Sequence, residues 1–288
     1  MSAALDHSGY RATIITGALL STAGLLSAGL YIEFTEQHRQ PNILVLYLTI
    51  LLTGLGFGVM YLPSVTIIKF YFDSKLGLAM GLAASGTGFG EFLWSPIVGF
   101  INQNTALARN FFFFAGINFA SLLFCFIYKS PEEEHKPDEA KARGGCLESF
   151  RSILTTPYKL LFILHALLVN IAIFAVLTFF APRATSFGIT ETNTSYLLSI
   201  MGLASFVCRI LFGVIADRFR GKVLWILFSV HFINGINIIL SQFYKTFLAQ
   251  ALVAVIYGAA FGAKVTLNVI LIRKPVISSQ FSNHLRRF

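Results

Sequence analysis

Three charged side chains lie deep inside long apolar stretches of the sequence. Arg209, Lys264 and Glu91 are each flanked on both sides by apolar or small residues. A guanidinium can hold a carboxylate through two hydrogen bonds, and an ammonium adds a second positive charge. A carboxyl group in such surroundings can carry a proton or pair with a cation across a cavity. These residue types predict a binding site for a small anion, with Arg209 and Lys264 as its binding groups.

The depth of these side chains follows from helix geometry. Arg209 precedes Asp217 by eight residues, or about 12 Å of helix, and Lys264 lies at a similar depth before Arg273. Glu91 follows Lys75 by 16 residues, or about 24 Å. Two alternatives stay open for the cations, because long basic side chains can reach the membrane surface or form structural ion pairs. Two roles also stay open for Glu91, which can act as a coupling group or as a salt-bridge partner.

The elements that must position these residues are membrane-spanning helices. The chain is 56% hydrophobic and only 12% charged, whereas an ordinary soluble domain carries about 25% charged residues. A spanning helix needs about 20 apolar residues. Eight such runs predict an all-α membrane protein: 12–32, 44–71, 76–101, 110–128, 159–181, 194–216, 223–241 and 247–272.

The distribution of basic residues supports this count. With eight spans, both termini and every second loop lie on one side, and most lysines and arginines fall there. The opposite loops carry only Arg39, Arg109, Arg183 and Lys245. The excess marks the cytoplasmic side, so both termini are expected in the cytoplasm. The net charge of +9 does not indicate a nucleic-acid partner, because the basic residues are scattered between apolar runs.

The spans divide into two groups of four. We expect an N-terminal half-bundle at 1–128, a charged cytoplasmic linker at 129–158, a C-terminal half-bundle at 159–272 and a cytoplasmic tail at 273–288. Two bundles joined by a linker are typical of carriers that rock one half against the other. The cysteines and histidines show no metal-ligand spacing, no cofactor motif is visible, and no catalytic constellation suggests an enzyme.

Two short segments on the cytoplasmic side share an acid, a glycine and a base. We expect each to form a tight turn between helices, with the acid capping a helix start or pairing across the bundle. The residues are Asp6, Gly9 and Arg11 in the first segment, and Asp217, Arg218 and Gly221 in the second. Both segments resemble the conformational loop motif of the major facilitator superfamily.

A longer match lies at 54–90, in the stretch GLGFGVMYLPSVTIIKFYFDSKLGLAMGLAASGTGFG. This stretch resembles the fourth and fifth helices of the monocarboxylate transporter family. The shared features are a glycine-rich helix, a Pro-Ser pair, Tyr-Phe, a basic turn and a Leu-Ala-x-Gly-Leu-Ala-x-Ser-Gly run. The glycines allow close approach of helices.

A third match is LLSIMGLASFVCRILFGVIADR at 197–218. The resemblance implies that Arg209 takes the place of the family's substrate-binding arginine. Lactate carriers of the family have an aspartate four residues earlier, where this chain has Ser205. By this alignment the chain is a partial 6+6 fold that lacks the family's first two and last two helices, and we interpret it as an incomplete gene model.

The resemblance implies a secondary transporter in the plasma membrane that moves a small monocarboxylate, or a related organic anion or zwitterion, by alternating access. It also implies a coupling ion, either proton or sodium, and raises the question of an immunoglobulin-like accessory glycoprotein. The alternative is a truncated or degenerate carrier that does not transport and acts as a membrane scaffold.

Overall fold

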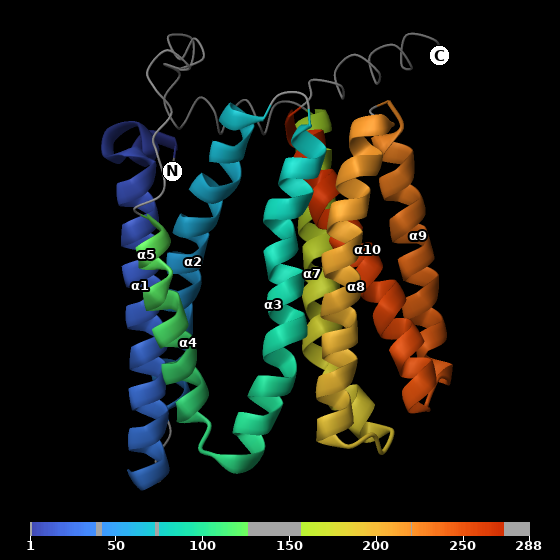
Figure 1. The fold of residues 1–288 in the computed structure, drawn as a ribbon. Helices are drawn as coiled ribbons and strands as arrows, with labels where there is room; N and C mark the ends of the chain where they lie inside the picture. The colour runs from blue at the N-terminus through green and yellow to red at the C-terminus, as the bar shows by residue number, and fades with distance from the viewer. Residues whose placement is uncertain (1, 39–41, 73–74, 126–156, 220, 274–288) are drawn as a thin grey trace. The chain divides into compact units, whose positions relative to one another are not determined.

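The computed structural model describes residues 2–38, 42–72, 75–125, 157–219 and 221–273, and these residues are almost entirely helical (Figure 1). No β-strand occurs among them, which confirms the predicted all-α class. The helices are α1 (Ser2–His38), α2 (Ile43–Tyr71), α3 (Leu76–Asn104), α4 (Ala108–Ala120), α5 (Leu122–Cys125), α7 (Pro157–Ser186), α8 (Glu191–Arg218), α9 (Val223–Leu240), the 3-10 helix η3 (Ser241–Phe243) and α10 (Phe247–Arg273).

Six of these helices contain segments long and apolar enough to cross a membrane. They are Arg11–Thr35, Ile43–Tyr61, Ile163–Ser186, Glu191–Arg218, Val223–Phe243 and Phe247–Asn268. Large apolar side chains cover their exposed faces, as on α9, where Trp225, Phe228 and Phe232 are exposed. Such a surface is compatible with the hydrocarbon core of a lipid bilayer.

The other two expected spans have a different character. The run expected at 76–101 forms α3, which is rich in glycine, carries Glu91 and is not among these six segments. The run expected at 110–128 forms the short helices α4 and α5, which meet at Ser121. The expected linker falls outside the described residues except for its last two, which begin α7. Beyond Arg273, the expected tail also falls outside them.

The described helices fall into two compact units. The first contains residues 1–74 and 97–135, and the second contains residues 75–96 and 136–288. Helix α3 therefore contributes to both, with its residues up to Pro96 in the second unit. Residues 75–96, which belong to the expected half-bundle 1–128, group here with the second unit.

In the first unit, α1 packs closely against α2 and α4. A Cβ atom at Gly17 would lie 2.8 Å from the carbonyl oxygen of Gly56, so only glycine fits this contact. The Asn118 amide of α4 donates hydrogen bonds to Ser21 (2.7 Å) and Thr22 (2.9 Å) of α1. Small residues and polar side chains thus join these helices, as is usual where lipid supplies no hydrophobic driving force.

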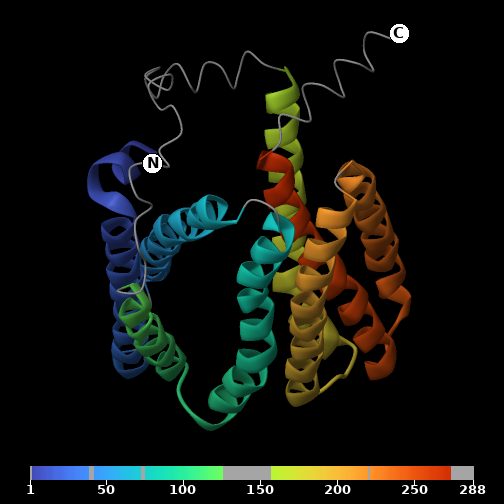
Figure 2. The same cartoon turned by 45° about the horizontal axis from the view of Figure 1, so that its top comes forward.

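In the second unit, α8 packs closely against both α3 and α10 (Figure 2). Toward α10, a Cβ at Gly258 would lie 2.1 Å from the Met201 carbonyl oxygen. Toward α3, a Cβ at Gly88 would lie 2.6 Å from the amide nitrogen of Phe206. Glycine on the neighbouring helices therefore lets both backbones approach the backbone of α8. An apolar core formed by α7, α8 and α10 includes Phe180, Leu197 and Met201.

Pro96 explains one hydrogen bond between α3 and α8. Proline has no N–H, so the carbonyl of Phe92, four residues earlier, cannot receive its helical hydrogen bond. The Ser199 hydroxyl of α8 donates to this carbonyl at 3.0 Å. A backbone group freed by proline inside a membrane must find such a partner within the protein.

We predict that Ser199→Ala lowers the free energy of unfolding by about 0.5–1.5 kcal/mol, the usual net value of one hydrogen bond. In a Pro96→Ala background the loss should be smaller, because the N–H of the new alanine can satisfy the Phe92 carbonyl. Reversible denaturation in detergent of the four proteins of this double-mutant cycle measures the difference. Equal losses in the two backgrounds would contradict the explanation.

Candidate functional site

Asp217 connects the end of α8 to the start of α3. Its two carboxylate oxygens accept hydrogen bonds from the backbone N–H groups of Gly77 (3.0 Å) and Leu78 (2.9 Å). These N–H groups belong to the first turn of α3, where a helix has no internal acceptors and favours a negative charge. Gly77 must be glycine, because a Cβ there would lie 2.5 Å from the backbone carbonyl oxygen of Gly213. The expected role of Asp217 as a cap across the bundle is therefore present.

The other motif residues differ in their surroundings. Arg218 is the last residue of α8, and Gly221 is exposed in the turn before α9. The expected turn at Asp6, Gly9 and Arg11 is wrong, because α1 runs without a break from Ser2 to His38. One glycine costs a helix only about 1 kcal/mol, and no proline interrupts this segment. Sequence similarity to a loop motif therefore overestimated its tendency to turn.

Arg209 is buried in the middle of α8 and is only 2% exposed. Its guanidinium donates hydrogen bonds to the carbonyl oxygen of Ala84 and the hydroxyl of Thr87, both on α3. It also donates to the Ser205 hydroxyl at 3.2 Å and lies over the Phe261 ring of α10 at 5.2 Å. Arg209 therefore links three helices of the second unit.

Glu91 lies on α3 near this contact. It is partly buried and close enough to Arg209 and Tyr257 to interact with them electrostatically. Its backbone approaches α8 closely, since a Cβ at Gly202 would lie 2.8 Å from the Glu91 carbonyl carbon. The structure thus brings the predicted acid near one of the two predicted cations.

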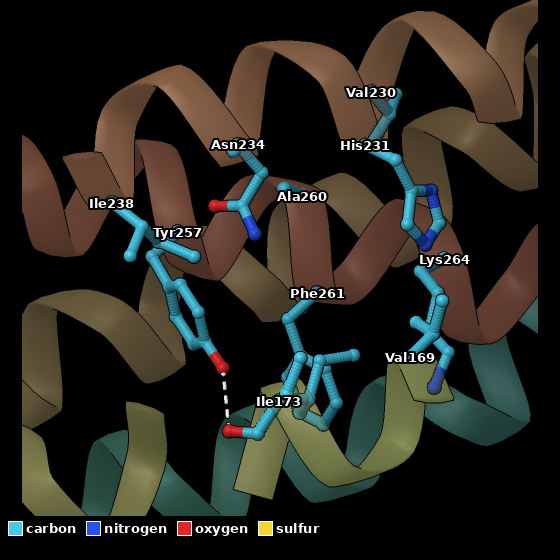
Figure 3. Close-up of a pocket in the computed structure, with 12 residues that line it drawn as sticks. Val169, Ile173, Val230, His231, Asn234, Ile238, Tyr257, Ala260, Phe261 and Lys264 are labelled. Carbon is cyan, nitrogen blue, oxygen red and sulfur yellow. Dashed lines mark hydrogen bonds between the residues drawn. The ribbon is translucent and has the colours of Figure 1, made fainter. Parts of the chain in front are cut away.

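Lys264 lies in a different environment, in a cavity of about 160 Å³ between α7, α9 and α10 (Figure 3). The ammonium is buried and donates a hydrogen bond to the Asn170 side-chain oxygen at 2.7 Å. His231 and Asn234 of α9 line the same cavity. Among the described residues, no acidic side chain pairs with Lys264. A cation, an imidazole and an amide around an apolar cavity can bind a small anion and orient it.

The two predicted cations do not share this cavity. Lys264 lines it, whereas Arg209 does not. Phe261 lies between them, because it lines the cavity and also contacts the guanidinium of Arg209. Equal depth along two helices did not fix the direction in which each side chain points.

The other polar residues of the cavity were not among the predicted binding groups. His231 lies near His165, with ring centroids 5.8 Å apart, and its Nδ1 lies 2.9 Å from the Leu227 carbonyl oxygen. The Tyr257 hydroxyl donates to the Ile173 carbonyl at 2.9 Å. A signal was present, because His231 and Asn234, like Phe261 and Lys264, are three residues apart and so lie on one helix face. The structure holds no group of three metal-binding side chains within its described ranges.

Comparison with known proteins gives a consistent result. A model of the Major Facilitator Superfamily matches residues 1–276. Monocarboxylate transporter 13 of Rattus norvegicus is 25% identical over 256 residues, which cover 88% of this chain and 57% of that protein. Monocarboxylate transporter 12-B of Danio rerio is 25% identical over 303 residues, covering 94% and 61%.

Monocarboxylate transporter 2 of Homo sapiens is likewise 25% identical, over 91% of this chain and 58% of its own length. The chain therefore spans little more than half the length of these relatives. These similarities confirm the resemblance predicted from the motifs, and the apolar helices agree with a multi-pass membrane protein.

We predict that Asp217→Ala lowers the free energy of unfolding by about 1–3 kcal/mol, because it leaves two N–H groups of α3 without their acceptors. Asp217→Asn should lose less, since its amide oxygen can still accept. Glu191→Ala is the control, because Glu191 is an exposed acid in the first turn of α8. Thermal unfolding in detergent compares the three variants. A loss in Asp217→Ala no larger than in Glu191→Ala would exclude the capping role.

Proposed function

Since this chain belongs to the Major Facilitator Superfamily, we propose that it is a secondary transporter of a small monocarboxylate or a related organic anion or zwitterion. It acts in the plasma membrane by alternating access, with both termini in the cytoplasm. The similarity to proteins named monocarboxylate transporters supports this substrate class. So does the excess of basic residues on the side assigned to the cytoplasm.

The observation that carries the proposal is the buried ammonium of Lys264. A charge taken out of water is costly unless it is paired. The hydrogen-bond partner of Lys264 is a neutral amide, and an ammonium has three donors. A carboxylate in the adjoining cavity would supply the missing negative charge. Lys264 is therefore one substrate-binding group of the proposed carrier.

Arg209 is proposed as the second substrate-binding group, with a different role. If 1–128 and 159–272 are the moving halves, its hydrogen bonds to Ala84 and Thr87 connect them. A substrate carboxylate would compete with these neutral acceptors for the guanidinium, since charge-assisted bonds are roughly twice as strong. Substrate binding at Arg209 would then loosen the contact between α3 and α8.

Glu91 is the proposed coupling group. Its interaction with Arg209 is strongest when the carboxyl group is ionised. Binding of a proton or a sodium ion at Glu91 would weaken its electrostatic attraction to Arg209. The guanidinium would then be available to bind the substrate carboxylate. An immunoglobulin-like accessory glycoprotein is a further proposal that rests on the resemblance alone, and co-purification from membranes tests it.

Uptake by the reconstituted chain tests the proposal. Proteoliposomes containing the 288-residue protein should accumulate radiolabelled pyruvate or benzoate above empty liposomes. Lys264→Met and Arg209→Ala should each lower uptake at least about tenfold, as expected for the loss of a charge-assisted hydrogen bond. Lys245→Met and Arg109→Ala are matched controls, because both side chains are exposed in the structure.

The outcomes separate the parts of the proposal. Unchanged uptake in Arg209→Ala or Lys264→Met removes that residue from the substrate site. Absence of uptake of either compound by the folded wild-type chain contradicts transport and favours the membrane scaffold instead.

A further inference from the structure

A further cationic side chain of the second unit, Arg183, lies against a cavity other than the one that Lys264 lines. Arg183, in the last turn of α7, donates a hydrogen bond from Nη1 to the Ser241 hydroxyl at 2.8 Å. Its guanidinium lies over the Phe187 ring at 5.4 Å. The other terminal nitrogen, Nη2, is buried and has no hydrogen-bond partner among the described residues. A buried donor without an acceptor is costly, so this nitrogen is a candidate to bind an acceptor group of a ligand.

The cavity beside Arg183 indicates what that ligand is. It has a volume of about 240 Å³ and lies between α7, α10 and the end of α9. Arg183 and Ser241 supply polar groups, whereas Phe179, Phe180 and Val253 are among the apolar side chains that line it. A guanidinium with a free terminal nitrogen binds a carboxylate well, and apolar walls favour a ligand with an apolar or aromatic body.

The Arg183 cavity adjoins the Lys264 cavity. Ile238 and Tyr257 line both cavities. The Tyr257 ring is held in place by the hydrogen bond from its hydroxyl to the Ile173 carbonyl, which Figure 3 shows beside the Lys264 cavity. Ile238 and Tyr257 therefore lie between two cavities, one lined by Lys264 and the other by Arg183.

We propose that Arg183 forms a second anion-binding site, and that its ligand is a monocarboxylate with an apolar or aromatic body. The Arg183 guanidinium binds the carboxylate, and the phenylalanine rings contact the rest of the ligand. This inference rests on the proposed function for the substrate class, because it makes Arg183 a first binding position beside the Lys264 cavity. Binding at Arg183 itself does not require transport.

Equilibrium binding of radiolabelled benzoate to the purified full chain tests this site. The protein is placed in phosphatidylcholine nanodiscs, which contain no anionic lipid. Arg183→Met, which removes the charge but keeps an apolar chain, should abolish one benzoate site or weaken it at least about tenfold. Lys264→Met should leave that site intact. Benzyl alcohol, which lacks the carboxylate, should not distinguish wild type from Arg183→Met.

A second variant separates ligand binding from a purely structural role of Arg183. Ser241→Ala removes the hydrogen-bond partner of Arg183 and should reduce thermal stability. If Arg183 binds the ligand, this variant should keep the benzoate affinity of the wild type, because the guanidinium is still present. If Arg183→Met only lowers stability while every benzoate site of the wild type remains, the proposal is overturned. Nanodiscs that also contain phosphatidylglycerol separate a free carboxylate from a lipid headgroup. Displacement of benzoate from Arg183 by that lipid would assign the site to a headgroup and overturn the proposed ligand.

Failure of this inference is distinct from failure of the proposed function. Loss of uptake in Lys264→Met together with unchanged benzoate binding in Arg183→Met retains the carrier and removes the second site. Benzoate binding that depends on Arg183 in a chain without uptake retains the site and removes the carrier.

Discussion

Lipid offers no hydrogen bonds, so a polar group inside a membrane-spanning bundle is costly unless it has a partner within the protein. In the second unit, α8 meets this constraint on two sides. Its Ser199 satisfies a carbonyl that Pro96 leaves free, and its Asp217 satisfies two N–H groups at the start of α3. Toward α10, the Thr266 hydroxyl donates to the Arg209 carbonyl at 3.2 Å. These bonds require the close backbone approach that Gly77 and its neighbouring glycines allow.

Much of the fold could be predicted from the sequence, because the length of an apolar run and the side that carries positive charge are local properties of the chain. Capping of a helix start was one of the two roles expected for Asp217, the other being a pair across the bundle, because a side-chain carboxylate can accept from the N–H groups of a helix start. The turn predicted around Gly9 is wrong, because similarity to a loop motif does not determine whether a helix ends at that point. The grouping of residues 75–96 with the C-terminal helices depends on contacts between distant residues, which one sequence does not reveal.

The candidate site was harder to predict than the fold. Burial of Arg209 and Lys264 followed from their apolar neighbours, but the direction of each side chain depends on helix rotation. Each residue turns the helix by about 100°, so two side chains at equal depth on neighbouring helices can still point in different directions. Arg183 was assigned only to a loop side, because its position at a helix end resembles that of an ordinary surface arginine. The sequence does not show that Ser241 and Phe187 lie beside its guanidinium, so the burial of Nη2 could not be predicted.

Hydrogen-bond satisfaction distinguishes the three cations Arg209, Lys264 and Arg183 better than burial does. Arg209 is the most buried, yet its guanidinium already has acceptors on α3 and α8. A ligand at Arg209 must replace those acceptors, so binding there is coupled to a change in helix packing. Lys264 and Arg183 each adjoin a cavity and retain donors that the neighbouring side chains do not fill. Lys264 and Arg183 therefore face cavities with donors that remain available, whereas a ligand at Arg209 must first displace existing acceptors.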